Sequence, residues 1–155
     1  MPSQETGADE AAGVTLRCGD NPLVEVRFRD RTGFVPDPVH YAVELRAPGL
    51  AARLDDIVAW PASGDPGAFL AALAGDFRGW TGERTWRTAD RDLALTAVFR
   101  SRGHVGITWT VRPWRSADGS WSASATTWLE AGAQLSAAAD DIGRFLAPDG
   151  DGPRG

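Results

Sequence analysis

The segment 80–92, WTGERTWRTADRD, contains the densest group of polar and aromatic side chains in the chain. Arg84 and Arg87 carry planar guanidinium groups that match the geometry of a carboxylate or phosphate, and Trp80 and Trp86 carry rings for stacking. One interpretation is a surface recognition loop built from these four residues. The alternative is structural: the Trp rings anchor a helix-to-strand connection while the arginines pair with neighbouring carboxylates, as is common on protein surfaces.

Two further candidate binding residues, His104 and Trp128, lie in the C-terminal half. The chain has seven Trp residues, and four of them fall in or beside the last predicted hairpin, which suggests an aromatic-lined groove. Trp109 shares the alternation of Ile107 and is expected in the core. Trp128 shares the alternation of its Ser and Thr neighbours and is expected on the opposite, more polar face. His104 is also expected on a polar face, where it is either a solvated side chain at a strand end or a general base.

Other kinds of chemistry have little support in the sequence. Neither His40 nor His104 has a Cys, Asp or Glu at metal-ligand spacing, so we expect no metal. Cys18 alternates with apolar residues, which predicts a small buried side chain rather than a reactive thiolate. The chain has no phosphate-binding loop, no dinucleotide fingerprint and no nucleophile elbow, so we expect no cofactor and no catalytic residue can be assigned.

The length and charge of the chain limit the kinds of partner that it can bind. With 155 residues the chain has the length of one domain, and no apolar run is long enough to cross a bilayer. All 16 basic residues are Arg, and 21 acidic residues give a net charge of −5, which disfavours nucleic acid and anionic membranes. The single Cys and an N-terminus without a signal-peptide pattern predict a cytoplasmic protein.

Hydrophobic periodicity predicts seven strands and two helices. We expect one domain over residues 14–147, with flexible tails at 1–13 and 148–155 that are rich in polar residues and turn formers. The expected strands are 14–18, 24–28, 39–47, 50–60 with a bulge at Asp55-Asp56, 93–99, 105–111 and 121–129. The expected helices begin at Asp65-Pro66, with a stripe that runs to Phe77, and at about Ala133, ending at Leu146.

Short connections between most strands favour antiparallel pairing. The predicted fold class is therefore α+β, with one curved, mainly antiparallel sheet of about six to seven strands and two amphipathic helices. Such a sheet would curl, and its concave side would offer a groove.

Several short segments carry a resemblance to a known family. They are Tyr41-Ala42-Val43-Glu44-Leu45, Asp55 to Trp60, the pattern Trp80-x-Gly82-x-Arg84-x-Trp86, and Gly103-His104-Val105-Gly106 to Trp114. Through them the chain resembles an uncharacterised family of short actinobacterial proteins, classed only as a domain of unknown function (series 6228), over about residues 14–146. This resemblance implies no activity. In the order of its elements the chain is also similar to immunity proteins of the WapI type, which bind and neutralise a toxin domain.

These observations favour a non-enzymatic cytoplasmic interaction module of the immunity type, which binds a basic protein partner. One alternative is a protein that binds a small organic ligand in a Trp-lined groove. The less favoured alternative is an enzyme that uses His104 with Arg84 or Arg87. The sequence does not fix the oligomeric state.

Overall fold

The computed structural model describes residues 13–33, 37–61, 64–113 and 121–147. Both predicted tails lie almost wholly outside these ranges. Within them, eight strands, two helices and one short 3-10 turn follow one another along the chain. In order they are β1 (Val14–Arg17), β2 (Glu25–Thr32), β3 (Val39–Ala47), β4 (Leu50–Ala59), α2 (Pro66–Gly75), β5 (Glu83–Arg87), β6 (Leu93–Arg100), η2 (Ser101–Gly103), β7 (His104–Val111), β8 (Ala123–Glu130) and α3 (Ala133–Leu146).

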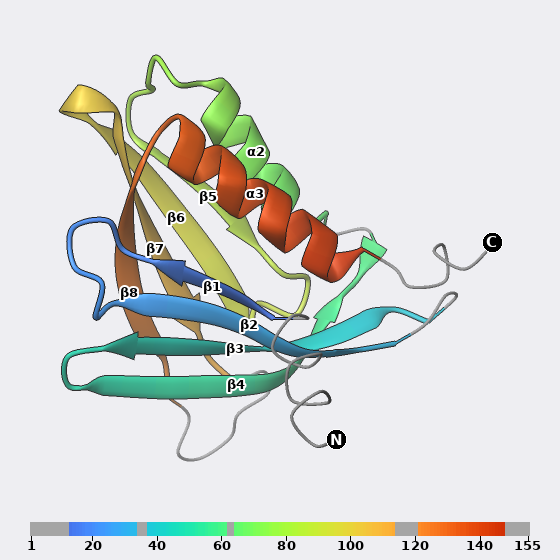
Figure 1. Ribbon diagram of the computed structural model, residues 1–155. Helices are drawn as coiled ribbons and strands as arrows, with labels where there is room; N and C mark the ends of the chain where they lie inside the picture. The colour runs from blue at the N-terminus through green and yellow to red at the C-terminus, as the bar shows by residue number, and fades with distance from the viewer. Residues whose placement is uncertain (1–12, 34–36, 62–63, 114–120, 148–155) are drawn as a thin grey trace, which may run out of the picture.

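The strands form two antiparallel sheets of four strands each, β1-β2-β3-β4 and β5-β6-β7-β8. The α+β class and the antiparallel pairing are therefore confirmed, whereas the prediction of one curved sheet was wrong. Each sheet is a meander in which consecutive strands pair, and α2 separates the last strand of the first sheet from the first strand of the second. Figure 1 shows the two sheets splayed apart, with both helices on the same side of the second sheet.

The prediction of a recognition loop over 80–92 was also wrong in part, because Glu83–Arg87 forms the edge strand β5. Its register with β6 places Arg84 opposite Ala97 and Trp86 opposite Leu95. Only one of its five residues is strongly apolar, so the alternation that identifies the other strands is almost absent. Charged side chains are typical of an edge strand, since they discourage pairing with another chain.

The core lies where the two sheets and α3 meet. Phe28 of β2 stacks on Tyr41 of β3 with ring centroids 5.7 Å apart, and it meets Trp109 of β7 and Phe145 of α3 edge to face at 6.0 and 6.1 Å. Edge-to-face pairs of this kind add about 0.5 to 1.5 kcal/mol each beyond the area they bury. Trp109 is fully buried, and its indole N–H donates to the Thr127 hydroxyl at 2.9 Å. The expectation that Trp109 belongs to the core is confirmed.

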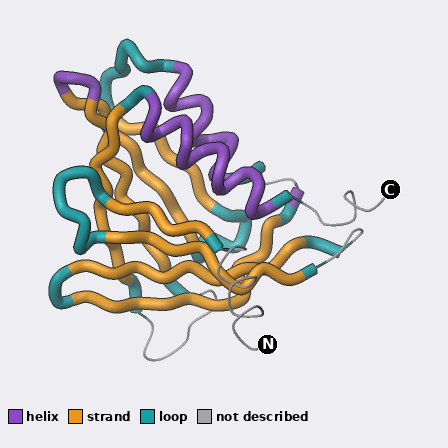
Figure 2. The backbone as a smooth tube through the Cα atoms, in the orientation of Figure 1, coloured by secondary structure: helices purple, strands orange, loops and turns teal. Residues whose placement is uncertain are grey.

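The two helices lie side by side against the sheets (Figure 2). The predicted start of α2 is confirmed: Asp65 caps the helix by accepting a hydrogen bond from the backbone N–H of Ala68 at 2.7 Å, and Pro66 follows it. The expected stripe is wrong at its end, because the helix stops at Gly75 and leaves Phe77 60% exposed. No helix in the described ranges is long and apolar enough to cross a membrane.

Close approach of the helices depends on Gly67. A Cβ atom at this position would lie 2.8 Å from the backbone nitrogen of Gly143 in α3 and 3.0 Å from the Ala139 carbonyl oxygen. Because a Cβ atom essentially never comes within 3.0 Å of another heavy atom, and both atoms here belong to the backbone, a larger residue would push the helices apart.

Candidate functional site

The six candidate residues fall into two groups on opposite faces of the second sheet. Trp80, Arg84 and Trp86 lie on the inner side, where the buried residues Leu95 and Ala97 of β6 also point. Arg87, His104 and Trp128 belong to the outer face, which turns away from the helices and the first sheet. The structure therefore does not assemble the six residues into one site.

The inner group is a packing cluster. Trp80 packs against Phe99 with ring centroids 5.3 Å apart, and the Arg84 guanidinium carbon lies 4.6 Å from the Trp80 ring centroid. Arg84 also pairs with Asp76 at the end of α2 through an Nη1–Oδ2 distance of 2.5 Å. Trp86 is partly buried and packs against the core. Arg84 is thus held by structural contacts, although its partner is Asp76 rather than the carboxylates within 80–92.

The outer face of the second sheet carries an unbroken row of threonines across its four strands. Thr85 of β5 is paired with Thr96 of β6, Thr96 with Thr108 of β7, and Thr108 with Thr126 of β8. On β6, β7 and β8, three adjacent rows of outward positions carry no charged residue: the threonine row and the row on each side of it. Together these rows form a block of nine positions. We call this block the threonine face: Ala94, Thr96, Val98, Gly106, Thr108, Thr110, Ser124, Thr126 and Trp128.

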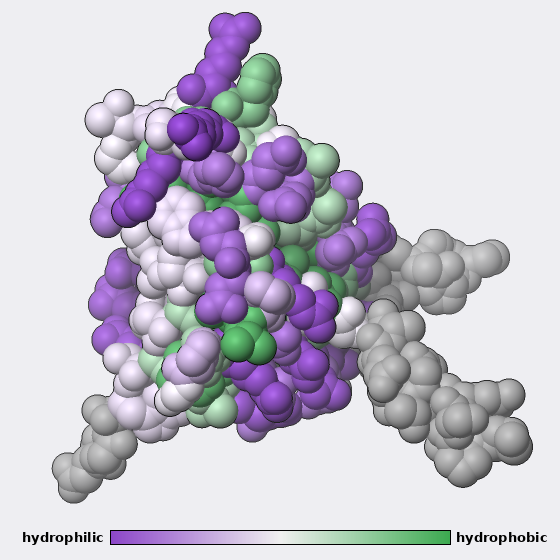
Figure 3. Space-filling model, turned by 60° about the vertical axis from the view of Figure 1, so that its left-hand side comes forward, coloured by the Kyte–Doolittle hydropathy of each residue, from purple (hydrophilic) through white to green (hydrophobic). Residues whose placement is uncertain are grey.

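The hydroxyl groups of the threonine face bond to one another. Thr108 Oγ1 lies 2.8 Å from Thr126 Oγ1, and Thr110 Oγ1 lies 2.8 Å from Ser124 Oγ. Hydroxyls that are already paired cost less to remove from water than unpaired ones. In Figure 3, side chains of intermediate hydropathy gather along the left-hand side of the molecule, with hydrophilic side chains around them.

The Trp128 ring fills the space that Gly106 leaves on this face because glycine has no side chain. It is paired with Gly106 across β7 and β8, and a Cβ atom at Gly106 would lie 2.5 Å from the tip of the Trp128 ring. The ring therefore lies across the glycine backbone, an arrangement known to support glycine within a sheet. The Arg100 guanidinium carbon lies 4.7 Å from the Trp128 ring centroid. The prediction that Trp128 belongs to the more polar face is confirmed, but part of its ring surface is used in packing.

His104 and Arg87 lie at the border of the threonine face, at opposite ends. Arg87 is opposite Ala94 and His104 is opposite Arg100, so about 20 Å of β6 separates their positions. Arg84 lies on the other face of the sheet. The geometry thus does not bring His104 together with either arginine, as the enzyme alternative requires. The residue opposite His104 in β8 is Glu130, at the border of the same face.

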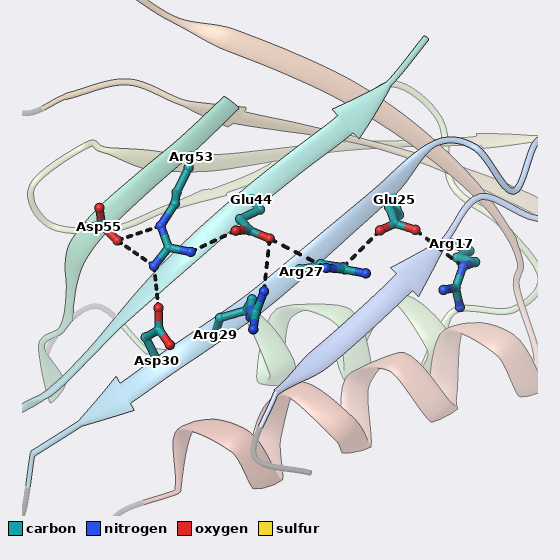
Figure 4. Close-up of polar contacts among 8 residues, drawn as sticks. All are labelled: Arg17, Glu25, Arg27, Arg29, Asp30, Glu44, Arg53 and Asp55. Carbon is teal, nitrogen blue, oxygen red and sulfur yellow. Dashed lines mark hydrogen bonds and ion pairs between the residues drawn. The ribbon is translucent and has the colours of Figure 1, made fainter. Parts of the chain in front are cut away.

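The outer face of the first sheet has the opposite character, because it is covered by a chain of ion pairs (Figure 4). Glu44 of β3 is only 9% exposed beneath arginines of β2 and β4. Arg53 donates from Nη1 to Glu44 Oε2 at 2.8 Å and also pairs with Asp55 and Asp30. Hydrogen bonds to Asp30, Asp55 and Glu44 raise the pKa of Arg53 above its ordinary value. The charged side chains on this face therefore form ion pairs with one another.

The turn from β5 to β6 contains a buried carboxylate. Asp92 is 5% exposed, and the Thr88 hydroxyl donates to its Oδ1 at 2.6 Å. Burial raises the pKa of Asp92 above 3.8 more than the Thr88 hydrogen bond lowers it. Within the described ranges, no group of three or more His, Cys, Asp or Glu residues is placed to hold a metal ion.

A family model described as a family of unknown function (DUF6228) matches residues 17–149 of the chain. The chain belongs to the DUF6228 family. This confirms the family resemblance seen in the sequence. No curated protein and no solved structure matches the chain.

For this DUF6228 protein, sequence reasoning missed the two features that organise the outer face. The first is the threonine row, which depends on strand register and on the unpredicted strand β5. The second is the pair of Gly106 and Trp128. A glycine inside a strand pattern signals the close approach of another group, and this signal was present in the sequence.

Proposed function

We propose that this DUF6228 protein is a non-enzymatic interaction module whose threonine face binds a protein partner. The observation that carries the proposal is the block of nine uncharged outward positions on β6 to β8. At about 4.8 Å between strands and 6.7 Å between outward positions, the block covers about 300 Å². This area is comparable with the lower end of the range of about 300 to 600 Å² for the largest apolar patch on a monomer.

The border of the face supports the proposal. Charged residues lie at the border of the uncharged block, together with His104: Glu83, Arg87, Arg100, Arg112 and Glu130. An uncharged centre with a polar rim is the usual anatomy of a protein interface. All nine central residues except buried Gly106 and exposed Ser124 are half-buried, so they are partly accessible without a partner.

The partner we propose is a basic protein, since the chain has a net charge of −5. Immunity against a toxin domain is the form of this function that the order of elements suggests, and the cytoplasm is the proposed location. A partner of this kind would cover the threonine face. The rim holds three arginines and two glutamates, so the attraction for a basic partner comes from the net charge of the whole chain and not from the rim.

The experiment introduces a charge at the centre of the face. The tagged chain is used to isolate a stoichiometric partner from the source cells, and the partner is then purified and titrated against Thr108→Arg. A long charged side chain at the centre should weaken binding by at least about 30-fold, the effect of losing a hot spot. The matched control is Ala51→Arg, because Ala51 is exposed on the outer face of the first sheet.

The control variant should bind like the wild type and unfold at the wild-type urea concentration. Thr108→Arg should lose about 1 kcal/mol of stability, because it removes the hydroxyl that pairs with Thr126, and should remain folded under the conditions of the titration. Equal binding by Thr108→Arg and the wild type would overturn the proposal. Isolation of no stoichiometric protein would overturn it as well.

A further inference from the structure

A cavity of about 680 Å³ opens beside Trp60, away from the threonine face. Its described walls come from the start of β3, the end of β4, the start of α2 and the last turn of α3. Pro38, Val39 and Leu146 supply apolar surface. This volume lies within the range of about 300 to 1,000 Å³ that is usual for small-molecule sites.

Trp60 gives the cavity an accessible aromatic ring. Its side chain is 42% exposed, which is unusual for a large hydrophobic residue in this chain. The indole N–H donates to Asp90 Oδ2 at 3.2 Å, so one edge of the ring is fixed. A fixed ring with an accessible surface is suited to stacking on an apolar group or a cation.

The charged side chains in the described lining of the cavity all have one sign. Asp37 and Asp65 line it, and the described lining contains no Arg, Lys or His residue. Asp65 uses Oδ1 to cap α2, which leaves its second carboxylate oxygen. Two arginines lie beside this lining: Arg31 donates to the Ala147 carbonyl at 3.3 Å, and Arg144 follows Gly143 in the last turn of α3, where it pairs with Asp141.

The last turn of α3 contributes less, because Arg31 and Arg144 lie at the same end of the helix and offset its partial charge. Gly143, Leu146 and Ala147 line the cavity, and the final carbonyl groups of a helix carry a partial negative charge of about half an electron. The positive end of α2 also reaches the cavity, but the Asp65 carboxylate caps it. The electrostatics of the described walls therefore favour a cation.

We propose that this cavity binds a small organic ammonium ion, with its apolar body against Trp60 and its charged group near Asp37 and Asp65. The apolar walls account for the body of the ligand. The two carboxylates account for its charge. This site is separate from the threonine face and does not depend on the proposed function.

The test uses three probes of similar shape: 2-phenylethylammonium, the neutral 2-phenylethanol and the anionic 3-phenylpropanoate. Binding to the full chain is followed by NMR at the backbone amides of Gly64 and Gly143 and at the indole N–H of Trp60. The ammonium probe should shift all three signals and saturate. The neutral and anionic probes should bind at least about tenfold more weakly, which corresponds to about 1.4 kcal/mol.

Two variants test the named contacts. The double variant Asp37→Asn with Asp65→Asn removes both charges, and Asn is as good a helix cap as Asp, so the fold should remain intact. The affinity of this double variant for the ammonium probe should fall to the affinity of the wild type for the alcohol. Trp60→Leu should weaken the binding of both the ammonium probe and the alcohol. Asp20→Asn and Phe77→Leu are matched controls, because both residues are exposed and lie outside the cavity lining.

Three results would overturn the proposal. Equal affinity for the ammonium and the alcohol would show an apolar cavity without charge selection. Absence of saturable shifts with the ammonium probe would show no site. Tighter binding of Nα-acetyl-lysine methylamide than of 2-phenylethylammonium would assign the cavity to a lysine side chain of another protein.

Discussion

Adding one methyl group at Gly106 should destabilise the protein, although alanine is normally preferred to glycine within a strand. The added Cβ would lie 2.5 Å from Cη2 of Trp128 and 2.7 Å from Cζ2 and Cζ3. Since carbon contacts are about 3.5 to 4.0 Å, the ring must move by about 1 Å or more. That movement disturbs its stacking with Arg100, so Gly106→Ala should cost about 1 to 3 kcal/mol.

The same substitution should have the opposite sign once the ring is removed. In a Trp128→Ala background, Gly106→Ala should stabilise the strand by about 0.5 to 1 kcal/mol, because glycine loses more backbone freedom on folding. Urea unfolding of the four proteins, followed by circular dichroism, gives the coupling between the two positions. An equal cost of Gly106→Ala in both backgrounds would refute the stacking of Trp128 on the glycine backbone.

Three further predictions concern the second sheet. Trp86→Ala should lower the free energy of unfolding by about 2 to 4 kcal/mol because it leaves a gap at the core, whereas Arg84→Ala should lower it by less than about 1 kcal/mol. A thermal melt of each variant checks this, and equal losses of stability would contradict it. The raised pKa of Asp92 means that the folded state binds more protons than the unfolded state between the ordinary carboxyl pKa and the raised one, so stability falls as pH rises through this window. Asp92→Asn should remove that fall in a pH series of urea unfolding, and an unchanged pH dependence would show that another group causes it. Thr108→Val should destabilise the protein by about 1 kcal/mol, because the Thr126 hydroxyl loses its partner. Adding Thr126→Val should restore most of this loss in a chemical unfolding curve. Additive losses would mean that the two hydroxyls are not paired.

The sequence predicts the individual strands well, and for a simple reason. The strands β2, β6 and β7 each bury one row of mainly apolar side chains, and this row produces the period of two. The bulge at Asp55-Asp56 is confirmed, because the register shifts there and Asp56 has a φ of 65°. The strand β5 lacked such a row, since an edge strand beside a helix buries little more than Trp86.

The division into two sheets was beyond the reach of local patterns. A strand with one buried face has the same sequence pattern whether that face packs on helices or on a second sheet. The contact that reveals two facing sheets is Phe28 with Trp109, which are 81 positions apart in the chain. The alternation of apolar and polar residues did predict that His104 and Trp128 lie on the polar face of their strands. It could not place Arg87 there, because the segment around it was interpreted as a loop.

The claim that the threonine face is the binding surface is tested most directly by the methyl signals of the threonines themselves. With threonine methyl groups labelled by ¹³C, partner binding should shift or broaden the signals of Thr96, Thr108 and Thr126. Thr15, which is exposed on the outer face of the first sheet opposite Arg27, is the internal reference and should not change. A shift of Thr15 without change at the three threonines of the second sheet would contradict the account.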